Sequence, residues 1–465
     1  MNDKPEKKIR SVVDQCADCD QCRDMMTEAC LFFPELYRLF DREEGESVPI
    51  TSKELRGLVE LCNFCCLCPC PEIRARVLEA KSYFIQRQGM TWEIKQIQDV
   101  ERLGSFLNRF PGLSNSLLKS RITSGMIKKI TGIHPDRLLP QAPGWDFHAL
   151  AKKMGLCDKH PVRYADKPKV AYFAGCSARY FFPDVAMAAV MVLQKNRVEV
   201  YLPSQKCCSM PTLLEGDVSF TRRLMSANLE HLTDAVESGY DIVFSCPTCG
   251  YMFKKLLREK ACYSSQYQEQ AGGDETFMMI PVENSTAGPK ETKHRRVHRA
   301  MSSGMKDDGV FSSLPPLMRI DIARKTFDLG EYLFILYREG KLDKGLSSVN
   351  KNIAYYPPCH TREQNMGLPY FDLLSLIPGL EVQVVRGSYL CCGMAGIMGC
   401  KQDFHHKSLE MAKPLLHKIR EMSPDVLVTE CLSCRLQFRQ TLPFPQAHPV
   451  EILAGAYLAG SEDDE

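Results

Sequence analysis

The chain has 465 residues, a formal net charge of +2 and 44% apolar residues, which predicts a globular protein of about three domains with no nucleic-acid partner. Its 22 cysteines do not indicate a secreted disulfide scaffold, because residues 1–10 lack a signal peptide and the cysteines occur in C-x2-C and CC units. The longest apolar run, Val185 to Leu193, has nine residues, whereas a membrane span needs about 20. We therefore expect a protein of the reducing cytoplasm.

Residues 1–100 carry a cysteine set of their own. Cys16, Cys19 and Cys22 are spaced by two residues and followed by Cys30, and Cys62, Cys65 and Cys68 are followed by Cys70. Three cysteines with this spacing bind three corners of a [4Fe-4S] cubane, and in two-cluster ferredoxins the fourth cysteine binds the other cluster. The pattern predicts a ferredoxin-like module with two cubanes: Cys16, Cys19 and Cys22 with Cys70, and Cys62, Cys65 and Cys68 with Cys30.

Two alternatives stay open for this module. Neither triplet ends in the usual x3-Cys-Pro, and Cys66 competes with Cys70 for the role of fourth ligand. A pair of zinc ribbons is the structural alternative, but it would use four ligands and leave one cysteine of each triplet without a role.

Residues 101–165 form a basic amphipathic segment. From Arg102 to Pro135 there is no acidic residue, and large apolar residues recur every three or four positions between lysines and arginines. Helices with one apolar and one cationic face lie in anionic membrane interfaces. They also pack across domains with their lysines reaching into water. Pro111, Gly112 and Gly125 break any long helix here.

The same five-cysteine pattern then occurs twice. Subtracting the first copy from the second gives offsets of 183, 184, 184, 185 and 185 residues. Runs such as Lys169–Phe173 and Asp241–Phe244, and their counterparts in the second copy, read as strands that alternate with helices in a parallel sheet. We predict one domain over 166–262 and a duplicate over 351–465. The first copy has Cys176, Cys207, Cys208, Cys246 and Cys249; the second has Cys359, Cys391, Cys392, Cys431 and Cys434.

Each quintet falls where strands end. The carboxyl ends of parallel strands are where ligands gather in open α/β sheets, so five sulfurs can meet there. A single zinc ion or a cubane takes four, which indicates a polynuclear thiolate site. The adjacent pair requires a sharp turn, for which the second copy supplies Gly393 and the first only Ser209.

Residues 263–350 are expected to be a polar linker that ends in a helix. The basic run Lys293 to Arg299 has neither interleaved aromatic residues nor a binding motif, so a solvated linker is the better interpretation. Helical periodicity resumes at Ile320 and continues to Tyr337. The chain has no dinucleotide fingerprint and no P-loop, and hydride chemistry would require another subunit.

Several residues remain outside these sets. Cys66, Cys157, Cys262 and Cys400 belong to neither quintet and to no triplet; Cys400 could be a thiol beside a cluster, although such a residue is more often small and buried. His360 could donate a hydrogen bond to a cluster sulfur, cap a helix or lie at the surface. His405 and His406 are expected on the surface of a helix.

The repeated C-x30-CC-x37-C-x2-C pattern, with the phrases Pro358-Cys-His360, Cys391-Cys-Gly-Met-Ala-Gly396 and Thr429-Glu-Cys-Leu-Ser-Cys434, resembles the cysteine-rich CCG domains of two families. These are the heterodisulfide reductase catalytic subunit (B/D type) and the iron–sulfur C subunit of anaerobic glycerol-3-phosphate dehydrogenase. The resemblance implies duplicated Rossmann-like α/β domains after the ferredoxin-like module. It also implies up to two non-cubane [4Fe-4S] clusters, one held by each quintet, with Cys207, Cys208, Cys391 and Cys392 as the catalytic pairs.

Three functions follow as hypotheses. The first is an iron–sulfur subunit of anaerobic respiration that relays electrons from a flavoprotein dehydrogenase to a membrane quinone or another carrier, with peripheral membrane association. The second is a heterodisulfide reductase-type subunit that cleaves a disulfide between the two copies. The third is a metal-stabilised binding scaffold without redox function.

Overall fold

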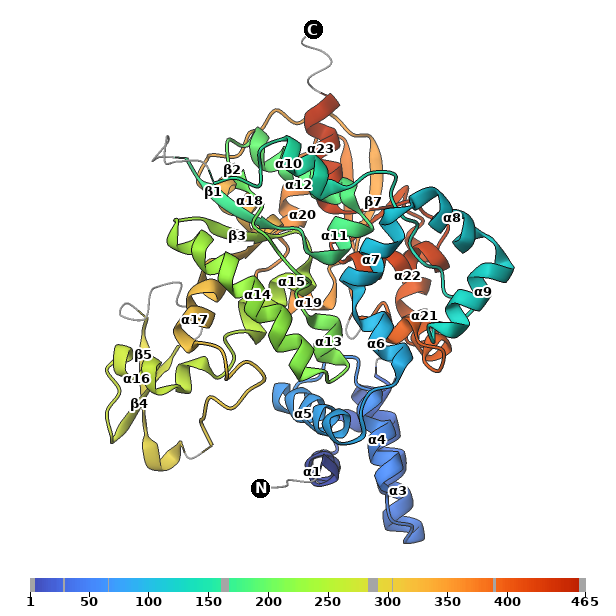
Figure 1. The fold of residues 1–465 in the computed structure, drawn as a ribbon, viewed down its shortest axis with the longest axis vertical. Helices are drawn as coiled ribbons and strands as arrows, with labels where there is room; N and C mark the ends of the chain where they lie inside the picture. Colours follow the sequence, from blue (N-terminus) through green and yellow to red (C-terminus); the bar gives the residue numbers. More distant parts are fainter. Residues whose placement is uncertain are drawn as a thin grey trace.

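The computed structural model describes residues 5–27, 30–65, 67–159, 167–282, 292–302, 304–387 and 390–459. An amino-terminal helical module lies below two α/β units, and a helical arm projects from one side (Figure 1). No helix within these ranges is both long and apolar enough to cross a bilayer.

The amino-terminal module is a small bundle with its own apolar core. That core combines Ile9 and Val13 with Leu36, Leu58 and Val77, all buried. A capping box starts one of its helices, because the Thr51 hydroxyl and the Glu54 carboxylate satisfy each other's backbone N–H groups. The helices are α1 (Pro5–Cys19), α2 (Cys22–Met25), α3 (Phe32–Glu46), α4 (Ser52–Glu60) and α5 (Pro71–Gln88).

The basic segment forms short helices, with the break at Pro111 that the sequence predicts but none at Gly125, which lies inside the helix Arg121–Ile130. Pro111 begins one of them and Ser120 caps the next. These short helices and one more, Phe147–Lys153, connect the amino-terminal bundle to the first sheet. Their bounds are α6 (Trp92–Gln98), α7 (Val100–Arg109), α8 (Pro111–Lys119), α9 (Arg121–Ile130) and α10 (Phe147–Lys153).

The first α/β unit has a parallel four-stranded sheet in the order β2-β1-β3-β6. Its strands are β1 (Lys169–Phe173), β2 (Glu199–Tyr201), β3 (Asp241–Phe244) and β6 (Thr326–Asp328). Its helices are α11 (Gly175–Tyr180), α12 (Pro183–Lys195), α13 (Met210–Leu214), α14 (Val218–Glu237), α15 (Pro247–Tyr251) and α18 (Leu329–Arg338), and a π-helical turn covers Met252–Leu256.

The second unit repeats this topology. Its sheet order β8-β7-β9-β10 is again parallel and matches the first sheet strand for strand, which confirms the predicted duplication of an α/β fold. The strands are β7 (Lys351–Tyr355), β8 (Leu380–Val384), β9 (Val426–Val428) and β10 (Gln446–Ala447). The helices are α19 (Cys359–Arg362), α20 (Pro369–Leu374), α21 (His405–Met422), α22 (Leu432–Thr441) and α23 (Pro449–Ala459), with a 3-10 turn at Met398–Cys400.

The segment expected to be a polar linker is folded in its described part, so that expectation was wrong. It contains α16 (Ser265–Ala271), an antiparallel pair of β4 (Phe277–Pro281) and β5 (His294–His298), and α17 (Pro316–Arg324). The run Phe277-Met-Met-Ile is apolar enough to form a strand, and Gln268 bonds to the backbone of Met279. The helix expected from Ile320 to Tyr337 is interrupted by β6, which completes the first sheet.

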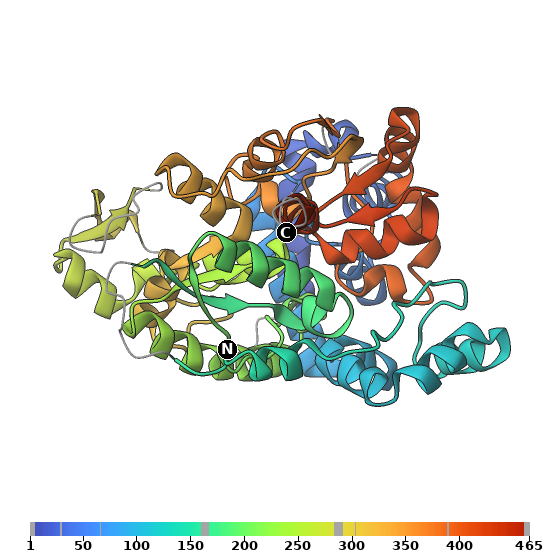
Figure 2. The same cartoon turned by 90° about the horizontal axis from the view of Figure 1, so that it is seen from above.

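The two units share one apolar core. Helix α23 of the second unit packs on α12 of the first, and α18 of the first packs on α20 of the second. Buried residues from both sheets, such as Tyr172 and Tyr355, belong to the same cluster. Seen from above, the two units lie side by side with α23 at their junction (Figure 2). The pairing is reciprocal, so the two halves are related as the subunits of a two-fold dimer would be.

Candidate iron–sulfur sites

Both quintets gather at the carboxyl edges of their sheets. Cys176, Cys246, Cys359 and Cys431 follow the central strands of the two sheets, and the adjacent pairs follow β2 and β8. Within the first quintet the sulfurs of Cys207 and Cys176 lie 3.5 Å apart. Within the second, the sulfurs of Cys434 and Cys392 lie 2.7 Å apart. The fold thus brings together residues that are up to 75 positions apart in sequence.

The turn after each adjacent pair is left-handed in both copies. Gly393 has a φ of +79°, and a Cβ built at this position would lie 2.1 Å from the Ser408 carbonyl oxygen. Ser209 adopts a φ of +68° with a side chain, so the first copy makes the same turn in a conformation that favours glycine. In the second copy the Gly393 N–H donates to the Cys391 sulfur at 3.3 Å.

The second cysteine of each pair is the most acidic thiol of its site. The Cys207 and Cys249 thiols hydrogen-bond to Cys208 and lower its pKa to about 6. In the other copy Cys391 and Cys434 do the same to Cys392, whose pKa falls well below its usual value. Because the thiolate is the form that binds metal, Cys208 and Cys392 are the thiols that lose their protons most readily for a metal.

Side chains that sequence reasoning missed hold the first pair in place. Asn228, fully buried on α14, accepts from the Lys206 N–H and donates to the Cys207 carbonyl. Glu101 on α7 accepts from the Cys207 N–H at 3.0 Å. Neither residue has a sequence signal, because each acts from a helix distant in the chain.

The first set of the amino-terminal module converges as expected. Burial raises the pKa of the Cys16 thiol to about 12, and the negative charges of the neighbouring thiolates raise it further. These neighbours are Cys22, Cys70 and Cys19. Cys19 and Cys70 are exposed, so this set reaches the protein surface. Cys66, the competing ligand, lies outside the described residues.

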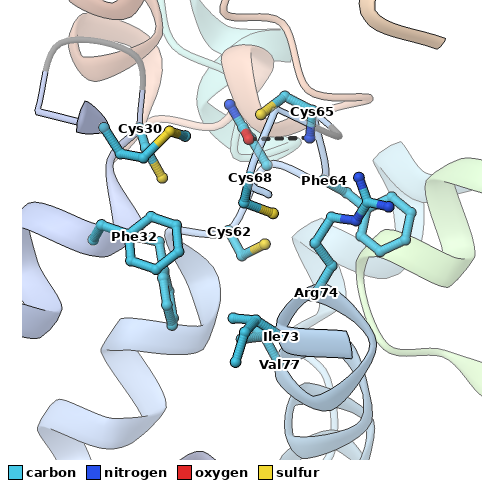
Figure 3. Close-up of a pocket in the computed structure, with 12 residues that line it drawn as sticks. Cys30, Phe32, Cys62, Phe64, Cys65, Cys68, Ile73, Arg74 and Val77 are labelled. Atoms are coloured by element: carbon cyan, nitrogen blue, oxygen red, sulfur yellow. Dashed lines mark hydrogen bonds between the residues drawn. The ribbon is translucent and has the colours of Figure 1, made fainter. Parts of the chain in front are cut away.

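The second set lines a pocket with an empty volume of about 330 Å³. Figure 3 shows Cys30, Cys62, Cys65 and Cys68 around it, with Arg74 and Phe64 at one side. Cys30 follows the other triplet, Cys16, Cys19 and Cys22, in the sequence. Burial raises the pKa of its thiol to about 12. The Asn63 side chain accepts from the Cys65 N–H and shapes the loop.

The donor sets fit iron–sulfur clusters. In the described part of the chain, no three cysteine, histidine, aspartate or glutamate side chains stand close enough to hold a single metal ion. Iron–sulfur clusters are held by cysteine thiolates, and each of the four sets consists of cysteines alone. Buried thiolates that raise one another's pKa, as around Cys16, need positive charge between them, and a bound metal supplies it.

The remaining predicted residues have different outcomes. His406 is exposed as expected, but His405 is 1% exposed, so its expected surface position was wrong. Its ring stacks on His134 at 4.2 Å and lies 3.4 Å from the Gly399 carbonyl. His360 is buried as well. Cys157, Cys262 and Cys400 are half-buried.

Comparison with protein families now adds to this geometry. The model of the cysteine-rich domain called CCG matches twice, over residues 170–254 and 353–439. This chain carries two CCG cysteine-rich domains. The matched ranges contain every cysteine of the two quintets.

The chain also aligns with curated proteins over more than half of its length. The chain is 26% identical to the C subunit of the anaerobic glycerol-3-phosphate dehydrogenase of Escherichia coli strain K12, over 77% of this chain and 76% of that protein. It is 22% identical to the B subunit of the fumarate reductase (CoM/CoB) of Methanothermobacter marburgensis, over 93% and 77%. It is 23% identical to the lactate utilization protein A of Halalkalibacterium halodurans, over 61% and 96%. The chain is homologous to these proteins.

Proposed function

We propose that this chain is the iron–sulfur electron-transfer subunit of an anaerobic oxidoreductase. It would relay electrons between a flavoprotein dehydrogenase partner and a membrane quinone or another carrier. Two cubanes and up to two non-cubane [4Fe-4S] clusters would supply one-electron steps when bound, held by the two cysteine sets of the amino-terminal module and the two quintets. The names of the relatives, which are subunits of a dehydrogenase and of a reductase, support this proposal.

One observation carries it: three of the four sulfur sets, the two of the amino-terminal module and the quintet of the second repeat, form a series from surface to interior. Cys19 and Cys70 are exposed. The Cys22 and Cys30 thiols are close enough for their charges to interact, as are those of Cys65 and Cys391. A metal site that only stabilises a binding scaffold does not need another metal site beside it, whereas electron transfer requires each centre to lie near the next.

The proposal is tested on protein purified without oxygen. We expect a brown protein with many iron atoms per chain and little zinc, and quinone reduction only when a flavoprotein dehydrogenase is present. Replacing Cys207 or Cys392 with serine should remove one cluster signal and leave the cubane signals. A colourless chain with stoichiometric zinc would instead identify a metal-stabilised scaffold.

The disulfide reductase remains a second candidate because both quintets are complete and face each other across the junction. Helix α15, which carries Cys249, packs on α19, which carries Cys359, and α11 packs on α22 in the same way. Addition of a heterodisulfide to the reduced protein should then oxidise the clusters of both CCG sites, and a relay alone would give no such response.

We also propose that the protein associates peripherally with the cytoplasmic membrane through the arm formed by α8 and α9. Its tip exposes large apolar side chains, of which Ile122 is 76% and Ile130 62% exposed, beside Arg121, Lys128 and Lys129. The combination suits an anionic lipid interface.

Sedimentation with vesicles containing anionic lipid tests the arm. The double variant Ile122→Ser, Ile130→Ser should lose binding, while Met301→Ser, at an equally exposed site on the insert after α16, should bind like the unmodified protein. Equal binding by both variants would rule out this role of the arm.

A further inference from the structure

The loop from Cys62 to Cys68 contacts both CCG sites. The Phe64 ring packs in one apolar cluster with Cys208, Cys246 and Cys249 of the first quintet. Cys65 packs with Cys391 of the second, and the Asn63 amide nitrogen lies 4.0 Å from the Cys391 sulfur. Three consecutive residues of one cysteine loop therefore meet two different sites.

His360 connects its own loop to two others, the loop that contains Phe64 and the loop that contains Thr248. Its Nε2 lies 3.3 Å from the Phe64 carbonyl oxygen, and its Nδ1 lies 3.0 Å from the Thr248 hydroxyl. Its ring stacks on Tyr251 with centroids 4.9 Å apart and 13° between the planes. His360 follows Cys359, Thr248 lies between Cys246 and Cys249, and Phe64 precedes Cys65. Each group it touches is therefore close to a cysteine of a different set.

The hydrogen bonds fix the state of the ring. A carbonyl can only accept, so Nε2 carries the hydrogen and Nδ1 accepts from the Thr248 hydroxyl. Both ring nitrogens thus have a partner on another loop. A neutral ring with both nitrogens satisfied adds no charge to the neighbouring sites. What it supplies is a fixed distance between three loops.

The two repeats differ at this position. The residue equivalent to His360 in the first repeat is Ser177, whose hydroxyl lies 4.0 Å from the sulfur of its own neighbour Cys176. A serine side chain is too short to span to another loop as His360 does. The second repeat, and not the first, is therefore connected to the amino-terminal module by this side chain. The second repeat also makes the contact between Cys65 and Cys391.

We propose that His360 is a positioning residue that sets the spacing between the cubane of Cys30, Cys62, Cys65 and Cys68 and both CCG sites, and that the second-repeat site receives the electron first. This inference rests on the proposed function. In the step, one electron leaves the reduced cubane and enters the cluster of the second repeat. No bond forms or breaks and no proton moves, and the flavoprotein restores the electron. The Thr248 contact then positions the first-repeat site as the next acceptor.

The test follows the arrival of electrons at each cluster. Protein with its clusters is mixed with dithionite, frozen at successive times and examined by electron paramagnetic resonance. Cys391→Ser and Cys207→Ser identify the signals of the two CCG sites. We expect the second-repeat signal to change before the first. In His360→Ala its reduction should slow, because loss of the bridge lets the cubane and the second-repeat site move apart and electron transfer slows steeply with distance.

Two further variants keep the test independent of folding. His360→Gln retains a donor for the Phe64 carbonyl and should restore most of the rate. Thr248→Val keeps the shape of the side chain without its hydroxyl and should slow only the first-repeat site. His417→Ala, on the exposed face of α21, should change nothing.

The outcomes separate this inference from the proposed function. If the first-repeat signal changes first, or if His360→Ala, His360→Gln and Thr248→Val all match the unmodified protein, the inference is wrong while the function stands. If the unmodified chain binds no iron, the proposed function itself has failed.

Discussion

At the scale of single residues, the sequence alone does not decide which cysteine is the fourth ligand of each cubane. Cys70 interacts electrostatically with Cys16 and precedes α5, whereas Cys30 lies on the pocket of the other set. This crossing has a physical basis: the helices α3 and α5 bring each end cysteine beside the opposite triplet.

Substitution of the two competing cysteines distinguishes the ligands. Cys70→Ser should lose one cubane, seen as loss of about half of the cubane signal in electron paramagnetic resonance, since an oxygen ligand replaces a thiolate. Cys66→Ser is the matched control and should keep both cubanes. Loss of a cubane in Cys66→Ser alone would reverse the assignment.

His448 ties the two repeats together as a neutral ring. It is fully buried, its Nε2 lies 2.8 Å from the Ser245 carbonyl of the first repeat, and its Nδ1 accepts from the Val450 N–H. Burial lowers its pKa to about 3. A proton on Nδ1 would remove the acceptor that caps α23.

This residue predicts an acid-sensitive stability. The unfolded chain takes up the proton near pH 6.5 and the folded chain only near pH 3, so the stability that the neutral ring contributes is lost as pH falls through this range. Between about pH 6.5 and 4.5 the loss should be roughly 2–3 kcal/mol. His448→Asn should show a shallower decline in denaturant titrations than the unmodified protein, and the exposed His417→Asn should not. Parallel curves for all three would contradict this role.

At the scale of elements, the arm is fixed at both ends. On α7, Asn108 donates to the Tyr180 carbonyl of α11, and Gly104 lies so close to Tyr180 that an added Cβ would come within 2.6 Å of it. After α9, the Arg137 guanidinium is fully buried in the second repeat. It donates to the Gly399 carbonyl and to the amide oxygens of Gln437 and Gln440.

Removal of the guanidinium should release that end of the arm. Arg137→Met leaves the buried Gln437 amide oxygen without the two N–H groups that it accepts from, so we expect a loss of roughly 3 kcal/mol in the free energy of unfolding, measured in denaturant. Arg121→Met, on the exposed face of α9, should stay within about 0.5 kcal/mol. A small effect of Arg137→Met would show that the arm is held by other contacts.

The sequence predicts those elements whose signal is local. The apolar runs at β1, β3, β7 and β9 read as strands, and Pro111 marks a helix start. The strand β6 is only three residues long, Thr326–Asp328, and takes its form from pairing with β3. The burial of Arg137 depends on partners about 300 positions away. Such a charge cannot be distinguished from a solvated one until the tertiary contacts are known.

At the scale of the whole molecule, the shared core predicts that the two repeats are stable only together. Leu453 on α23 and Leu333 on α18 are both buried in the cluster that spans the two units. Each helix packs on a helix of the other repeat, so loss of one should loosen the helix that it covers.

Hydrogen exchange should detect this dependence. Leu453→Ala in the second repeat should cost about 2–5 kcal/mol through the cavity it leaves, and it should also speed the exchange of α12 in the first repeat. Leu458→Ala, on the exposed side of the same helix, should leave α12 unchanged. Exchange confined to the second repeat would mean that the two units open independently.

The reciprocal packing of α12 with α23 and of α18 with α20 bears on the origin of the chain. A half-length precursor with one sheet would have exposed the apolar faces that these helices now cover, so it needed a second copy of itself to fold. Within one chain the two halves stay associated without having to be identical. The first half carries a folded insert between α15 and β6, and the second carries a histidine beside its leading cysteine.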